Sequence, residues 1–104
     1  MIRQTWLFAA SESDGPPVSK SIHQLFEALP GVLRLEYGAI SSRSTGQIRA
    51  AAILDVYFSD EDAMNAAYAC AEGRRISREV MNNAAAVLDV LIIDNPDSMS
   101  DGSH

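Results

Sequence analysis

The stretch from Ile48 to Asp62 alternates between two kinds of position and then changes to the start of a helix. Every even position from 48 to 58 is apolar, whereas the odd positions mix charged and apolar side chains. Because successive side chains of a strand point to opposite faces, this pattern predicts a central strand with one face buried under helices. Ser59 is predicted to cap the helix that follows, and three acidic residues after it oppose the positive end of the helix dipole.

The other strands and helices are predicted from the spacing of apolar residues, which is two in strands and three to four in helices. Strands are predicted over residues 2–10, 33–40 and 87–93, and a short amphipathic helix is predicted from Val18 to Leu29, before Pro30 and Gly31. An alanine-rich helix follows the central strand, and Gly73 is expected to interrupt it. After Gly73, a second helix and a kinked continuation of the first both fit the spacing.

The predicted order of strand, helix, strand, strand, helix, strand is that of the ferredoxin-like α+β fold. In this βαββαβ arrangement a four-stranded antiparallel sheet carries its helices on one face, and the third strand is central beside the first. The bare face is expected to carry Ile53, Tyr57 and Leu91, with Trp6 and Phe8 as further candidates. An open apolar face of this kind indicates a partner.

The register of the second and third strands follows from the requirement that Leu35 and Leu54 share the helix-covered face. Paired residue numbers must then sum to an odd value, because a slip by one residue would turn Arg34 and Glu36 towards the helices. A sum of 89 places Leu35 opposite Leu54 and Arg34 opposite Asp55.

Length and charge narrow the class of protein. A chain of 104 residues with 47% apolar content predicts a single domain, over residues 1–95, followed by a flexible tail over residues 96–104. A net charge of −6 and scattered basic residues disfavour a nucleic-acid partner. No run is long enough for a membrane span and no secretory signal is recognisable, so a cytoplasmic location is expected.

Titratable residues in apolar strands are the first candidates for chemistry. Asp55 and Asp89 interrupt apolar strands, where a carboxylate is costly unless it is paired or hydrated. With Tyr57 they could form a proton-transfer site, or they could make structural pairs with Arg34 and Arg49. The open face supplies the candidate ligand-lining residues, which are Trp6, Phe8, Arg34, Glu36, Ile53, Asp55, Tyr57 and Asp89.

For the remaining aromatic, histidine and cysteine residues, a structural role is favoured over a chemical one. Trp6 and Phe8 could line an aromatic pocket, although a pair at strand spacing is more often core or dimer contact. His23 lies off the apolar stripe of its predicted helix, which favours a hydrated position. Cys70 is the only cysteine, and glycine-rich phosphate loops and metal-binding motifs are lacking. Neither a cofactor nor a metal is therefore expected.

The segment VYFSDEDAMNAAYACAEGRRISREVMNNAAAVLDVLIID resembles the carboxy-terminal half of the EthD-like family, in the dimeric α+β barrel superfamily. LPGVLRLEY is similar to that family's turn into its second strand, whereas the predicted first helix, SKSIHQLFEALP, lacks the family's histidine motif. The resemblance implies a homodimer whose two sheets pack face to face around a cavity. It also implies activity on small, often aromatic or polyketide-like molecules, commonly without a cofactor.

Two functional hypotheses follow. The first is a small cofactor-independent enzyme or binding protein that takes a hydrophobic metabolite in a dimer cavity. The alternative is a dimerisation or protein-interaction module without catalysis, in which the partner fills the open face completely. A cavity large enough for a small molecule would distinguish the first hypothesis from the second.

Overall fold

Seven helices and strands form the described part of the chain. The computed structural model describes residues 1–9, 18, 20–40, 50–82 and 87–95. The elements are β1 (Ile2–Ala9), α1 (Lys20–Glu27), β2 (Arg34–Ala39), β3 (Ala50–Phe58), α2 (Glu61–Ala69), α3 (Ala71–Asn82) and β4 (Val87–Asp94). This order confirms the predicted βαββαβ arrangement, with two helices in place of one between β3 and β4.

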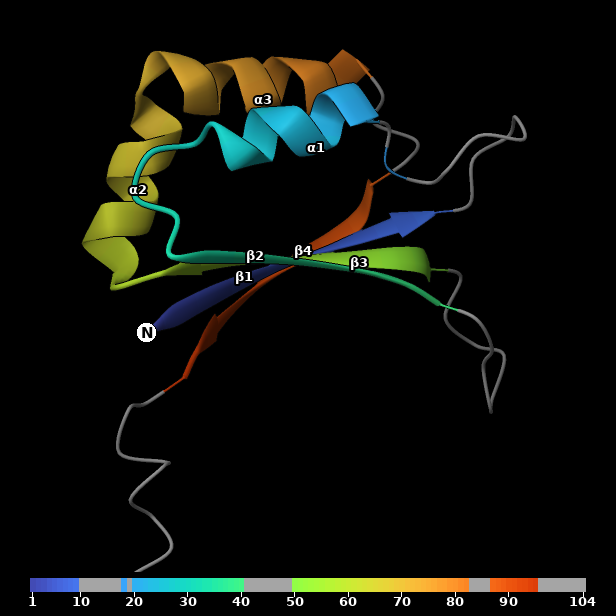
Figure 1. Cartoon of the computed structure of the whole chain (residues 1–104), viewed down its shortest axis with the longest axis horizontal. Coiled ribbons are helices and arrows are strands. Elements are labelled where there is room, and N and C mark those ends of the chain that lie inside the picture. Colours follow the sequence, from blue (N-terminus) through green and yellow to red (C-terminus); the bar gives the residue numbers. More distant parts are fainter. Residues whose placement is uncertain (10–17, 19, 41–49, 83–86, 96–104) are drawn as a thin grey trace, which may run out of the picture.

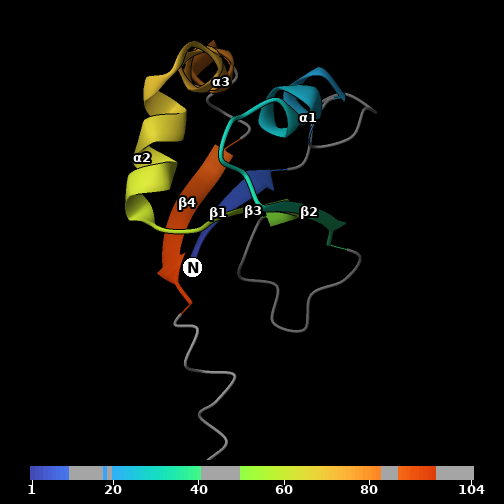
Figure 2. The same ribbon diagram turned by 60° about the vertical axis from the view of Figure 1, so that its left-hand side comes forward.

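The four strands form one antiparallel sheet in the order β2-β3-β1-β4. The third strand therefore lies beside the first at the centre, as predicted. Figure 1 shows all three helices on one face of this sheet, and Figure 2 shows the opposite face uncovered by any helix. We call these the covered face and the open face.

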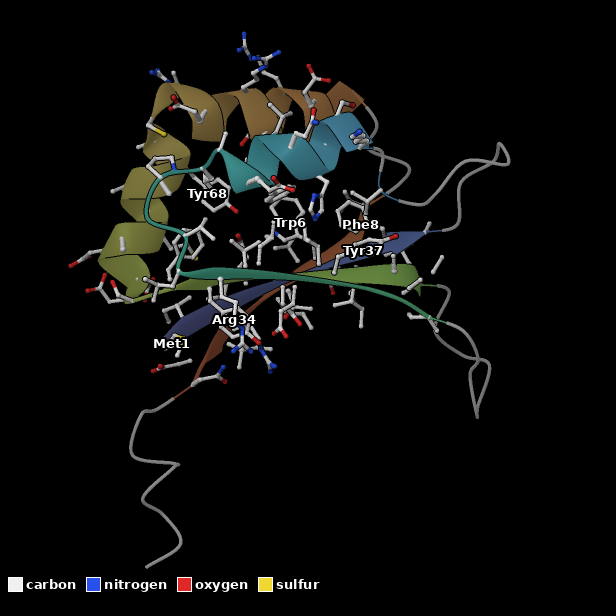
Figure 3. All side chains as sticks on the ribbon, viewed as in Figure 1. Met1, Trp6, Phe8, Arg34, Tyr37 and Tyr68 are labelled. Carbon is white, nitrogen blue, oxygen red and sulfur yellow. The ribbon has the colours of Figure 1, made fainter. Side chains whose placement is uncertain are left out.

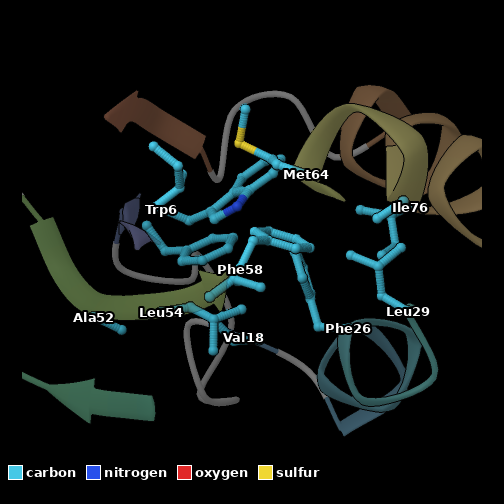
Figure 4. Packing of buried hydrophobic residues seen from close by; sticks show 13 residues of the cluster. Trp6, Val18, Phe26, Leu29, Ala52, Leu54, Phe58, Met64 and Ile76 are labelled. Atoms are coloured by element: carbon cyan, nitrogen blue, oxygen red, sulfur yellow. The ribbon is translucent and has the colours of Figure 1, made fainter. Parts of the chain in front are cut away.

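The covered face carries the hydrophobic core. Even-numbered residues of β1 and β3 point into it because paired residues of neighbouring strands share a face. Leu54 at the centre of β3 and Phe26 of α1 are both 0% exposed, and the Phe26 ring meets Trp6 edge to face at 5.2 Å. Figure 4 shows this packing, in which α1, α2 and α3 each contribute a side chain.

The β2–β3 register differs from the predicted one by two residues. Arg34 pairs with Tyr57, Glu36 with Asp55, and Leu35 with Val56. The observed sum is odd, so Leu35 and Leu54 share the covered face as required. The predicted pairing of Arg34 with Asp55 is wrong. A shift of two residues leaves every side chain on its face, so the hydrophobic pattern cannot distinguish the two registers.

Helix boundaries provide two further corrections. The side chain of Asp60, not that of Ser59, accepts the capping hydrogen bond from the backbone N–H of Ala63, at 2.7 Å. The alanine-rich helix ends at Cys70, whose backbone is extended, and not at Gly73. Gly73 instead lies in the first turn of α3, close against α2.

Replacing the observed cap should destabilise the domain. Asp60→Ala removes the acceptor for a free N–H group of α2, so we expect a loss of about 1 kcal/mol of unfolding free energy in urea denaturation. Ser59→Ala is the matched control and should change stability by less than about 0.5 kcal/mol. A larger loss of unfolding free energy in Ser59→Ala than in Asp60→Ala would show that Ser59 caps the helix, as the sequence predicted.

Two expectations concern residues outside the described ranges. They are the structural pairing with Arg49 and the flexible tail over residues 96–104. Within the described ranges, none of the helices has the length and apolar content needed to cross a membrane.

Candidate functional site

The open face carries a cluster of polar side chains at one end of the sheet. Across the strands, one row places Arg34, Tyr57 and Arg3 side by side, and the next row places Glu36, Asp55 and Thr5 side by side. We call these six residues the open-face cluster. Figure 3 shows Arg34 on the side of the sheet away from the helices.

Short contacts tie this cluster together. Arg34 donates a hydrogen bond from Nη2 to Oε1 of Glu36 at 2.8 Å, and its guanidinium lies 4.7 Å from the centre of the Tyr57 ring. The hydrogen bond from Arg34, and secondarily one with Tyr57, keep the pKa of Glu36 below its usual range. The hydroxyl of Thr5 donates to Oδ1 of Asp55 at 2.5 Å. Asp55 therefore has a hydroxyl partner on β1, whereas Glu36, and not the predicted Arg34, lies opposite it on β2.

Two members of the predicted set lie further along the open face. Ile53 is next to Leu7, and Leu7 is paired with Asp89 of β4. The carboxylate of Asp89 accepts a hydrogen bond from the backbone N–H of Val90 at 2.8 Å and is exposed. Asp89 lies in the adjacent row but on the other side of β1 from Asp55, so the sheet does not bring the two carboxylates together.

Trp6 and Phe8 lie on the covered face, so the prediction that they line the open face is wrong. Their exposed fractions are 8% and 3%, and both belong to the hydrophobic core. The even positions of β1 include Ile2 and Phe8, which need burial, and this decides the orientation of the whole strand.

A buried polar cluster lies beside Trp6 under the helices. The hydroxyl of Tyr68, on α2, donates a hydrogen bond to Oε1 of Gln4, which is 7% exposed. Nε1 of Trp6 is buried and has no hydrogen-bond partner within the described ranges. Figure 3 shows Tyr68 pointing from α2 towards Trp6. We call Gln4, Trp6 and Tyr68 the buried polar cluster.

Electrostatics keep the buried polar cluster neutral. Burial raises the pKa of Tyr68 well above its usual range, and a weak interaction with the Trp6 indole N–H, which falls outside ordinary hydrogen-bond geometry, opposes this shift only in part. The tyrosine therefore remains a protonated hydrogen-bond donor over the whole neutral range. It can position or polarise an acceptor group, but it does not supply a phenolate base.

His23 lies on the flank of α1, half-buried, which agrees with its predicted position off the apolar stripe. Its Nδ1 is 2.6 Å from Oε1 of Glu27, one turn along the helix, and its ring packs edge to face against Tyr37 at 6.2 Å. As for metals, no group of three or more suitable side chains comes together in the described ranges.

Solved structures share this architecture with low sequence identity. An EthD-family protein from Bacillus halodurans matches with a TM-score of 0.81 and 15% identity, over 92% of this chain and 99% of the other. A dimeric ferredoxin-like protein of unknown function from Thermobifida fusca matches at 0.59 and 17%, over 88% and 86%. SnoaB, a cofactor-independent oxygenase from Streptomyces nogalater, matches at 0.57 and 13%, over 92% and 93%. No protein-family model matches the sequence, and no curated protein gives a significant match.

The chain has the EthD-like fold. The resemblance drawn from its carboxy-terminal half is thereby confirmed at the level of the fold, as is the wider ferredoxin-like class. At identities this low, the EthD-like fold fixes the arrangement of strands and helices and leaves the function to be argued from side chains.

Within the EthD-like fold, sequence reasoning missed Gln4 and Tyr68 as candidate site residues. In the sequence, Tyr68 has the spacing of the apolar residues in an alanine-rich helix, so nothing marks it as a site residue. Gln4 offered a signal, since it is the one polar side chain among the even positions of β1, between Ile2 and Trp6. A polar residue at a buried strand position needs a partner, and here that partner is Tyr68.

Proposed function

We propose that this protein is a homodimeric, cofactor-independent enzyme or binding protein for a hydrophobic aromatic metabolite, whose polar group is received by the buried polar cluster. One observation carries this proposal: Nε1 of Trp6 is buried and makes no well-formed hydrogen bond to any described residue, beside the Tyr68–Gln4 pair. Buried polar groups in native proteins are nearly always hydrogen-bonded, and leaving one unpaired costs about 1–3 kcal/mol. A ligand acceptor at this point would remove that cost.

The surroundings indicate which ligands fit. Phe8 stacks on Trp6 with ring centres 6.4 Å apart, and Phe26 meets the same indole edge to face. The cluster itself is uncharged, so a neutral aromatic carbonyl or quinone suits it better than an ionised molecule. SnoaB, which shares this fold, is a cofactor-independent oxygenase, and this supports chemistry without a cofactor here as well, with the reactivity residing in the substrate.

The open face supports the homodimer. It carries apolar residues from β1, β3 and β4 next to the open-face cluster, and Leu91 is 42% exposed there. A second copy would bury this surface, and a relative of this fold is described as dimeric. The expected cytoplasmic location belongs to the same proposal.

Trp6 is the only tryptophan, so its emission reports directly on the proposed site. Menadione offers two carbonyl acceptors on a neutral naphthalene-type ring, and 2-methylnaphthalene is the matched probe without acceptors. We expect saturable binding of menadione, by tryptophan emission and calorimetry, about tenfold tighter than that of the hydrocarbon, because one buried hydrogen bond contributes about 1.4 kcal/mol.

Paired tyrosine variants locate the binding. Tyr68→Phe should weaken menadione binding severalfold, since the hydroxyl beside the indole is lost. Tyr37→Phe, at the outer strand β2 and 41% exposed, should leave the affinity unchanged. Equal affinities for the two probes would contradict the acceptor site, and absence of saturable binding by either would favour the interaction-module alternative.

A further inference from the structure

The open-face cluster is patterned so that a second copy of the chain can match it in only one alignment. This inference rests on the proposed homodimer and concerns how its two sheets are superposed. Across the sheet, the basic row reads Arg34, Tyr57, Arg3 and Ile93. The adjacent acidic row reads Glu36, Asp55, Thr5 and Leu91.

Within one chain, each row retains an unmet requirement. In the acidic row, Glu36 and Asp55 are directly opposite each other on neighbouring strands, and Arg34 forms an ion pair with Glu36 alone, so that Asp55 has the Thr5 hydroxyl and no cationic partner among the residues described. In the basic row, Nε of Arg3 is buried and has no hydrogen-bond partner among the residues described. A carboxylate without a cationic partner and an arginine with an unpaired Nε, both within the described residues, thus lie in adjacent rows on the same face.

The two-fold symmetry of a homodimer limits how a second copy can supply partners for both rows. Two sheets of a face-to-face homodimer are related by a two-fold axis that lies in the plane between them. If that axis runs across the strands and between the two rows, the basic row of each copy lies over the acidic row of the other. Arg34 then faces Glu36 of the second copy, Tyr57 faces Asp55, and Ile93 faces Leu91, while Arg3 lies one strand away from Asp55.

We propose that the homodimer adopts this crossed alignment, with the two-fold axis perpendicular to the strands between the basic and acidic rows. Stacked sheets are about 10 Å apart, a gap that arginine and glutamate side chains reaching from opposite sides can bridge. In this alignment Arg34 meets the opposite charge of Glu36, the Tyr57 hydroxyl can donate to Asp55, and Ile93 meets the apolar Leu91.

The competing alignment places the axis along the strands, between β1 and β3. Arg34 would then lie over Ile93 of the second copy, and Glu36 would lie over Leu91. Both charged groups would lose water and keep only their contact with each other, which is costly at an interface. The basic rows of the two copies would also lie together, and juxtaposed like charges oppose association.

A charge swap inside the chain tests the alignment through the dimer dissociation constant, measured by sedimentation equilibrium. Arg34→Glu puts a glutamate over Glu36 at two symmetry-related places, so we expect dissociation to rise about tenfold or more. Glu36→Arg should have a similar effect through paired arginines. The double variant Arg34→Glu/Glu36→Arg restores opposite charges in every crossed pair and should bring dissociation back to within about threefold of the original.

Arg78→Glu is the matched control, because it makes the same change of charge on an exposed position of α3, away from the open face. Far-ultraviolet circular dichroism establishes that each variant is folded. Arg34→Gln and Glu36→Gln repeat the test without charge reversal should a reversed variant fail to fold.

The outcomes separate the alignment from the homodimer itself. An original protein that stays monomeric at high micromolar concentration would overturn the proposed homodimer. A stable dimer in which Arg34→Glu has no more effect than Arg78→Glu, or in which the double variant is not rescued, would overturn only the crossed alignment.

Discussion

Gly73→Ala should destabilise the domain strongly. A Cβ atom at this position would lie 2.3 Å from the backbone oxygen of Ala67 and 2.4 Å from Cα of Tyr68, both in α2. Backbone atoms cannot rotate aside, so α3 would have to move away from α2. We expect a loss of about 3 kcal/mol or more of unfolding free energy, at the upper end of what overpacking costs.

The sign of this effect is informative, because helix propensity predicts the reverse. In an exposed helix, replacing glycine with alanine stabilises by about 1 kcal/mol. Urea denaturation measures Gly73→Ala, and Gly38→Ala in strand β2 is the control for adding a Cβ without a clash, since a Cβ there meets no atom within 4 Å. A Gly73→Ala variant as stable as the original would show that α2 and α3 do not approach this closely.

Gly73→Ala should also act on the proposed ligand site. The clash involves the backbone of Tyr68, whose hydroxyl donates to Gln4 in the buried polar cluster. Displacement of α2 would move that hydroxyl away from β1. We therefore expect menadione affinity to fall in any Gly73→Ala protein that remains folded.

Leu54→Ala should cost about 2–5 kcal/mol of unfolding free energy, the range for leucine truncation in a packed core. Leu54 is 0% exposed on the central strand β3, between Trp6 of β1 and Tyr37 of β2. Its removal leaves a cavity that neighbouring strands cannot close, because the sheet holds their spacing.

The matched control is Leu33→Ala, which removes the same atoms from a side chain that is 62% exposed. Its expected cost is less than about 0.5 kcal/mol. Thermal unfolding followed by tryptophan emission measures both variants. Similar losses for the two leucines would mean that the covered face is not the core.

Much of the fold could be predicted because its signals are local. The strands appear as alternation, and the helices appear as threefold and fourfold spacing. The break between α2 and α3 was misplaced for an equally local reason. Glycine is the obvious helix breaker, yet the chain bends at Cys70, and Gly73 serves to let two backbones come close.

The candidate site was predicted less well, because it depends on which face each strand turns towards the helices. β1 has apolar residues at both even and odd positions, so alternation alone did not settle the placement of Trp6 and Phe8. Once β1 pairs with β3, Trp6 lies next to Leu54 and must share its buried face. The same pairing turns Gln4 inwards, where Tyr68 meets it.

Hydrophobic periodicity acts residue by residue, so the order of elements, the covered face of β3 and the odd register of the hairpin could all be predicted from the amino-acid pattern. The offset of two residues between β2 and β3, which sets Glu36 and not Arg34 opposite Asp55, depends on how the whole chain packs. A two-residue shift conserves every buried side chain, so its free-energy difference lies in long-range contacts that no local pattern records. The buried polar cluster has the same origin, since Gln4 and Tyr68 are 64 positions apart in the chain and meet only when α2 packs on the sheet.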